Sequence, residues 1–306
     1  MLRGVWGMTA LTTNPLSLGI NYEIAVTPPG RLMRWIMQGA AAEFLPDRRV
    51  ALCMRLPVPS ADGVALLQSV VGGYAHYGNL GVCGSVWHCP ICAAKITERR
   101  AAELMVSYDR WIKEGHYAVM VAYTVSHSID DSIGRVNGWI SAASRHLHSG
   151  KRWQTLKARY GIVGTITGTE ITYGGSGWHV HRHVMYWLNR PLDRLVLAGL
   201  EGDLGAAWRH EIEKAGGFAD VEHGCILSVP EDYGNYTVGL VEYICKWGLV
   251  QEVTKSNQKR GRGGSRSVWQ LLLDASYGDY RSWYWRRSGH SCRKEVYSPL
   301  RGVNPA

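Results

Sequence analysis

Three histidines stand at every second position of one segment, and this alternation constrains the fold more than any other feature. Residues 177–187 read Gly-Trp-His-Val-His-Arg-His-Val-Met-Tyr-Trp, which places the imidazoles at His179, His181 and His183. Side chains alternate between the two faces of a β-strand, so a strand here projects all three from one face. Because imidazole is the commonest metal-binding side chain, the alternation predicts a metal-binding face. A His-rich polar face without an ion is the alternative interpretation.

The segment before the histidines predicts the partner strand of a β-hairpin. Residues 162–173 are rich in β-branched side chains and bounded by glycines, and Gly-Gly-Ser-Gly at 174–177 forms a short loop. If the loop closes symmetrically, Tyr173 lies opposite Trp178 and Glu170 lies opposite His181. Directly opposed residues share a sheet face, so the hairpin brings a carboxylate beside the imidazoles. A slip of one residue in this register would move Glu170 to the other face and destroy the site.

The remaining patterns predict an α+β fold, in which helices pack on an antiparallel sheet. Helical periodicity of the apolar residues is found in three ranges, 96–112, 193–214 and 236–249. Short apolar runs favour strands over 117–126 and 222–229. A further helix is expected after Asp130 or Asp131, either of which could cap it. Apolar residues make up 46% of the 306 residues, which is enough for a substantial core.

Four regions are expected along the chain. They are an irregular N-terminal region over 1–78, a zinc-binding cysteine segment with a helix over 79–115, a core with the hairpin over 116–254, and a basic loop with a C-terminal tail over 255–306. The loop begins with residues 255–267, which are poor in apolar side chains. Its basic side chains are expected to contact phosphates, and a solvated linker is the alternative interpretation. These candidate DNA contacts are Lys259, Arg260, Arg262 and Arg266.

The overall charge favours an acidic partner. The chain has 34 Lys and Arg against 25 Asp and Glu, a formal net charge of +9, and nucleic acid is the simplest partner of a basic protein. No apolar run reaches the roughly 18 residues that span a bilayer, so no membrane association is expected. The seven cysteines are an odd number and no secretory signal is evident, which favours a reducing cytoplasm.

A cluster of cysteines predicts a structural zinc site. Cys89-Pro-Ile-Cys92 places two thiols two residues apart, so that both can reach one tetrahedral ion through a tight turn, and Cys83 adds a third ligand. The fourth ligand is open among His88, His76 and Cys53. We favour Cys53, because His88 adjoins Cys89 and is expected to point away. Buried free cysteines are the alternative, and this packing role is expected for Cys225, Cys245 and Cys292.

One tyrosine is a candidate nucleophile. Tyr243 and Lys246 are three residues apart in the predicted helix over 236–249, and therefore share a helical face. A tyrosine hydroxyl, with a pKa of about 10, attacks poorly unless its proton is withdrawn or its anion is stabilised. A nearby lysine or metal ion could do either. Tyr236 is the reserve candidate, and a purely structural tyrosine is the alternative interpretation.

Together these motifs resemble those of the rolling-circle replication initiators of small plasmids, the Rep proteins, a branch of the HUH endonucleases. The resemblance spans roughly residues 80–302. It includes the cysteine segment with Arg99 and Arg100, the Glu170 and histidine hairpin, and the Tyr243-x-x-Lys segment. The fourth part is Trp269-Gln-Leu-Leu-Leu-Asp followed by Tyr297-Ser-Pro-Leu-Arg.

The resemblance implies a metal-dependent nickase specific for one site and one strand of DNA. His181 and His183 match the metal pair of the family, and His179 and Glu170 are the accompanying candidate ligands. Tyr243 matches the nucleophile, which would form a 5′-phosphotyrosine link and free a 3′-OH for a polymerase. A carboxylate with imidazoles suits Mn²⁺, or Mg²⁺ through water-rich coordination. The implied partners are origin DNA, single-stranded or supercoiled, and a helicase and polymerase of the bacterial host.

Two positions depart from the family pattern. Arg182 stands where the family usually has an apolar residue, and we expect it on the opposite sheet face, towards DNA or solvent. Gly239 stands where some relatives carry a glutamate that helps to terminate replication. Three other functions stay open. They are a zinc-stabilised nucleic-acid-binding module without catalysis, a transposase or phage initiator of the same superfamily, and a two-His-one-carboxylate iron oxygenase.

Overall fold

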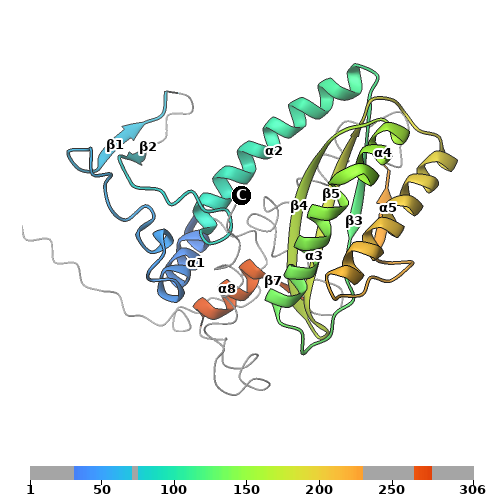
Figure 1. Cartoon of the computed structure of the whole chain (residues 1–306). Coiled ribbons are helices and arrows are strands. Elements are labelled where there is room, and N and C mark those ends of the chain that lie inside the picture. The colour runs from blue at the N-terminus through green and yellow to red at the C-terminus, as the bar shows by residue number, and fades with distance from the viewer. Residues whose placement is uncertain (1–30, 71–74, 230–264, 278–306) are drawn as a thin grey trace, which may run out of the picture.

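The centre of the fold is an antiparallel sheet (Figure 1), seen in a computed structural model that describes residues 31–70, 75–229 and 265–277. In these ranges the sheet has five strands in the order β6-β3-β5-β4-β7, and helices lie against it. This arrangement confirms the predicted α+β class. No helix in the described ranges combines the length and the apolarity that crossing a membrane requires.

Four strands of the sheet follow the predicted order along the chain, and a fifth, β7, was not predicted. They are β3 (Tyr117–Tyr123), β4 (Ile162–Gly174), β5 (Gly177–Leu188), β6 (Cys225–Ser228) and β7 (Arg266–Ser267). The strands predicted over 117–126 and 222–229 are both present, and both are shorter than expected. β5 is the central strand, with β3 on one side and β4 on the other, so the histidine segment lies in the middle of the sheet.

One face of the sheet is covered by α3 (Ile133–Leu147), α4 (Gly150–Tyr160) and α5 (Arg194–Lys214). The helix predicted over 193–214 is confirmed, and its apolar positions are all buried. They are Leu197, Leu200, Leu204, Trp208 and Ile212. The Trp208 indole also donates a hydrogen bond of 2.8 Å to the Thr124 carbonyl at the end of β3. Apolar burial and this bond together fix α5 on the sheet.

The long helix α2 (Pro90–Lys113) joins the sheet to the N-terminal elements (Figure 1). Its second half places Tyr108 against Met120 and Met185 on the sheet face opposite α3. The helix begins before the predicted residue 96, because Cys89 caps it and proline suits the first helical position. The first turns bury small side chains such as Ala93 and Ala94, which give little helical periodicity in the sequence.

The region 1–78, which we expected to be irregular, contains regular elements where it is described. They are α1 (Arg31–Phe44), the short helix η3 (Arg49–Leu52), β1 (Ala65–Gln68) and β2 (Ala75–Gly78). α1 is amphipathic, and its inner face buries Met37, Ala40 and Ala41 together with the polar Gln38. The Gln38 amide donates to the carbonyls of Val50 (2.9 Å) and Cys53 (3.2 Å), which ties α1 to η3.

Three further expectations differ from the structure. Ser132, not Asp130 or Asp131, caps α3, because the Asp131 carboxylate accepts hydrogen bonds from Ser128 instead. The end of the predicted basic loop forms β7, which leads directly into α8 (Val268–Ser276) through a capping box at Ser267. α8 packs on α1 within the region that we expected to be a tail. The helix predicted over 236–249 lies outside the described residues.

Candidate functional site

The histidine hairpin has the predicted register. β4 and β5 are joined by the two residues Gly175 and Ser176, and Glu170 pairs with His181 while Tyr173 pairs with Trp178. Gly177 is required for this closure because its φ is +93°. A Cβ there would lie 2.7 Å from the Ser128 carbonyl oxygen, in the connection between β3 and α3. The turn is therefore packed against that connection.

The imidazoles and the carboxylate meet on one face of the sheet. The His183 Nε2 atom lies 3.3 Å from a Glu170 carboxylate oxygen. The rings of His181 and His183 are stacked, with centroids 5.6 Å apart, and those of His179 and His181 meet edge to face at 4.1 Å. His183 is buried, while His179, His181 and Glu170 are partly accessible. The face is thus reachable by a ligand.

A fourth histidine, His127, joins this face from the connection after β3. Its Nδ1 atom lies 3.0 Å from the Ser176 carbonyl and its Nε2 atom 2.7 Å from Nδ1 of His179. A carbonyl only accepts, so in the neutral form of His127 the Nδ1 atom carries the proton and Nε2 accepts from His179. That leaves Nε2 of His179 without a proton and able to bind a metal ion. Sequence reasoning missed His127, because its approach depends on β3 lying beside β5.

Burial favours the neutral form of two of these imidazoles, His179 and His181. Desolvation, reinforced by the neighbouring His179 and His183, lowers the pKa of His181 to about 3. The pKa of His179 is also lowered, first by burial and then by His127. Only a neutral imidazole offers a lone pair to a metal ion, so both side chains can coordinate one near neutral pH.

The nitrogen and oxygen donor atoms of this face are too far apart to bind one metal ion in the positions that they occupy here. Ligands of one Mg²⁺, each about 2.1 Å from the ion, are at most about 4.2 Å apart. In the described part of the chain, the one group of three or more potential ligands with donor atoms all within 4.8 Å of one another is the cysteine cluster. The side chains on the hairpin are therefore of the types that bind a divalent ion. Their donor atoms are too far apart to bind one ion together, so the side chains must rotate before they can enclose it.

Four cysteines, Cys53, Cys83, Cys89 and Cys92, do converge, and this confirms the predicted approach of Cys53 to the other three. The sulfur of Cys53 lies 3.5 Å from that of Cys92 and 3.7 Å from that of Cys89, and Cys83 lies 3.7 Å from Cys92. A tetrahedral zinc site with bonds of about 2.3 Å has sulfur–sulfur edges of about 3.8 Å. All four thiols are free and far outside disulfide distance. The cluster could hold a metal such as zinc.

The surroundings of the sulfurs suit thiolates. Backbone N–H groups donate to them, from Cys83 to Cys53 (3.4 Å), from Ser85 to Cys83 (3.4 Å) and from Cys92 to Cys89 (3.5 Å). Hydrogen bonds from Cys83 and Cys89 lower the pKa of Cys53 to about 7, and those from its three neighbours lower the pKa of Cys92. The same contacts, led by Cys53, raise the pKa of Cys83 and Cys89. A bound metal ion would replace these shared protons.

The other candidate ligands of the cysteine site lie elsewhere. The His88 Nδ1 atom is 2.9 Å from the Ser85 hydroxyl, and His76 is exposed on β2. Cys225, which we expected to be a packing residue, is buried in the core between α5 and the sheet. The packing role is thus confirmed for Cys225, while Cys245 and Cys292 lie outside the described residues.

Arg182 lies on the sheet face opposite the histidines, as expected from the alternation. It does not simply reach solvent, because it is half-buried and donates a 3.1 Å hydrogen bond to the Ser141 hydroxyl of α3. Arg266 lies in β7 opposite Tyr173 and forms an ion pair of 3.5 Å with Asp274. Its place in a strand corrects the expectation of a loop contact.

Several predicted site residues lie outside the described residues, so their positions relative to the hairpin stay predictions. They are Tyr243, Lys246, Tyr236, Lys259, Arg260 and Arg262.

Two curated proteins are similar to part of the chain. A protein named "Protein rep" from Streptomyces lividans is 29% identical over 152 residues, which are 41% of this chain and 33% of that protein. A "Neomycin resistance protein" from Streptomyces cyanogenus is 26% identical over 148 residues, 40% of this chain and 34% of that protein. The chain spans about a third of the length of these relatives. No family model and no solved structure matches it. Taken with the cysteine and histidine motifs, these similarities support the assignment of the chain to a plasmid Rep family.

Proposed function

We propose that the chain is a replication initiator that nicks one strand of origin DNA through attack of a tyrosine on a phosphodiester. The observation that carries the proposal is the hairpin face, on which His179, His181 and His183 lie beside Glu170. The similarity to a protein named rep and the net charge of +9 support it. The sheet with its central histidine strand suits an HUH endonuclease core.

The hairpin residues would hold the divalent ion, Mn²⁺ or Mg²⁺. When bound, such an ion polarises the scissile phosphate and offsets the charge that develops on its oxygens. His181 and His183 provide neutral nitrogen donors, and Glu170 adds the negative charge that hard cations prefer. His127 holds His179 in the tautomer whose Nε2 atom is available. Because all but His127 lie on paired strands, the face is rigid and only the side chains need to adjust.

Tyr243 would carry out the covalent step. Its phenolic oxygen forms a bond to phosphorus while the bond from phosphorus to the 3′ oxygen breaks. The leaving oxygen takes a proton to become the free 3′-OH, and the phenolic proton passes to solvent. Lys246, on the same predicted helical face, would stabilise the phenolate. The 3′-OH would then prime a host polymerase, with a host helicase opening the duplex in the bacterial cytoplasm.

The proposal is tested with the full chain and labelled single-stranded oligonucleotides tiled across the DNA that flanks its coding sequence. With Mn²⁺ or Mg²⁺, one oligonucleotide should give a labelled protein band that survives denaturation, and Tyr243→Phe should abolish it. Tyr236→Phe is the matched control and should keep the band. If Tyr243→Phe forms the band at the wild-type rate, the assignment of the nucleophile is wrong.

A zinc-stabilised DNA-binding module without catalysis is the second candidate. It is favoured by the convergence of the four cysteines, which contrasts with the open arrangement of the histidine face. The double variant His181→Ala/His183→Ala separates the two functions. For a nickase, the variant keeps its fold, zinc content and DNA binding and loses only the covalent band. For a binding module, the wild-type protein itself forms no band with either metal.

A further inference from the structure

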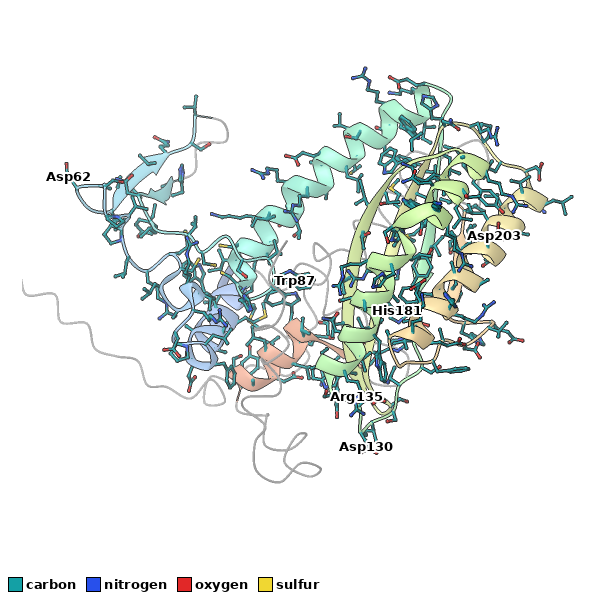
Figure 2. All side chains as sticks on the ribbon, in the orientation of Figure 1. Asp62, Trp87, Asp130, Arg135, His181 and Asp203 are labelled. Atoms are coloured by element: carbon teal, nitrogen blue, oxygen red, sulfur yellow. The ribbon has the colours of Figure 1, made fainter. Side chains whose placement is uncertain are left out.

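A cavity of about 300 Å³ lies between the cysteine segment and the sheet, on the face opposite the histidines. Its walls come from the cysteine segment through Trp87, from α3 through Asn137, Ser141 and Arg145, and from the sheet through Arg182 and β4. Figure 2 shows Trp87 between the N-terminal elements and the sheet. The cavity therefore combines an aromatic ring, two guanidinium groups and several neutral polar groups.

The two guanidinium groups give the cavity a positive charge, and no acidic side chain is among the described residues that line it. Arg182 is half-buried, and Arg145 of α3 is exposed. In the described ranges, no carboxylate is among the charges acting on Arg182, and its buried Nε atom has no hydrogen-bond partner. A partly buried cation without a counter-charge is costly, so this wall of the cavity favours an anion. Planar guanidinium groups suit phosphate in particular.

The aromatic wall adds a second requirement. Trp87 is half-buried and packs against the apolar cluster that contains the cysteines, so this cluster holds the ring in place. A tryptophan beside a phosphate-binding wall is the combination with which proteins hold a nucleotide, since the base stacks on the ring while the phosphate meets the cations. The hydroxyl of Ser144 and the amide of Asn137 offer hydrogen bonds to the sugar or base edge.

We propose that this cavity binds one nucleotide of single-stranded DNA, with its phosphate on Arg145 and Arg182 and its base stacked on Trp87. The choice of DNA as the source of the nucleotide rests on the proposed function. The strand β4 connects the two sites, because Thr169 and Ile171 line the cavity while Glu170 belongs to the histidine face. DNA that passes around β4 would contact both faces of the sheet.

The test is equilibrium binding of a dye-labelled oligothymidylate to the full chain without added Mn²⁺ or Mg²⁺, so that no cleavage intervenes. Arg145→Ala and Trp87→Leu should each weaken binding about tenfold. Arg145→Ala should also reduce the slope of log K against log salt by about 0.7, the value for one phosphate contact on a single strand. Arg194→Ala, an equal loss of charge at the exposed start of α5, is the control. Pocket variants that bind like Arg194→Ala would overturn the proposal.

Two further measurements complete the design. Photocrosslinking with 5-iododeoxyuridine oligonucleotides should attach DNA to the peptide that contains Trp87, and labelling confined to other peptides would contradict the proposal. Calorimetric binding of thymidine monophosphate that depends on Arg145, in a protein that binds no oligonucleotide, would overturn the assignment to DNA. If the pocket variants bind normally while Tyr243→Phe loses the covalent band, the pocket alone fails. If Tyr243→Phe keeps the band while the pocket variants lose affinity, only the proposed nucleophile fails.

Discussion

Replacing Cys53 with alanine should destabilise the protein much more while a metal ion occupies the cysteine cluster than after the ion is removed. Cys53 follows η3 and lies 30 residues before Cys83, so a shared ion would cross-link two distant parts of the N-terminal region. The sulfur–sulfur distances of 3.5–3.7 Å match a tetrahedral site without strain. The full effect of the cross-link should therefore appear in the stability.

The size of the effect follows from chain entropy. A cross-link that closes a loop of 30 residues removes about 3.6 kcal/mol of conformational freedom from the unfolded chain. Loss of the buried sulfur alone costs on the order of 1 kcal/mol in apolar transfer. Cys53→Ala should therefore lower the free energy of unfolding by about 4–5 kcal/mol in zinc-loaded protein, and by about 1 kcal/mol after the metal is removed.

Urea unfolding followed by circular dichroism, with and without a zinc chelator, measures both values, and elemental analysis gives the zinc content. Cys225→Ala is the matched control, because Cys225 is also buried but belongs to the sheet core. Its effect should be the same with and without zinc. An equal loss of unfolding free energy for Cys53→Ala with and without the chelator would show that the four sulfurs are ordinary buried thiols. The same conclusion would follow if the chelator did not change the stability of the wild-type protein.

Three other predictions concern the hairpin and His148, the half-buried residue that caps the C-terminus of α3. His127→Phe should lower Mn²⁺ affinity about tenfold, because second-sphere partners of ligating histidines have effects of this size; calorimetric titration that gives the wild-type affinity would refute the orienting role. Gly177→Ala should destabilise by at least about 1–2 kcal/mol, since its φ is +93° and its Cβ meets a carbonyl oxygen at 2.7 Å. Gly175→Ala is the control and should not destabilise the protein, because nothing lies within 4 Å of the added Cβ. Equal melting temperatures for the two variants would contradict the packing of the turn. Burial lowers the pKa of His148, so the unfolded chain binds that proton more tightly and stability falls as the pH drops below about 6.5. The melting temperature of His148→Gln should fall less between pH 7 and 5, and parallel profiles would show that His148 is not responsible.

The parts of the site that depend on local sequence patterns could be predicted from the sequence. Alternation and a short glycine-rich loop predicted the register that pairs Glu170 with His181, because a period of two and a symmetric closure leave few choices. The approach of Cys53 to the cysteine segment was favoured over that of His88 by exclusion. In contrast, His127 reaches His179 only because β3 lies beside β5 in the sheet, and local sequence patterns do not predict the order of strands. α1 was missed for a different reason. No acidic residue in its first turn and no basic residue in its last turn marks its ends, and its buried face includes the polar Gln38.

The cysteine cluster and the proposed nucleotide pocket share one structural element, and this coupling can be measured. Trp87 lies between Cys83 and Cys89, and Cys89 also caps α2, whose second half packs on the sheet. An ion on the cysteines would therefore position the ring over the cavity without touching DNA. Zinc removal should weaken oligothymidylate binding about as much as Trp87→Leu, and the two changes together should cost no more than either alone. Losses that simply multiply would mean that the metal and the ring act independently, and the cluster would then have no part in binding the strand.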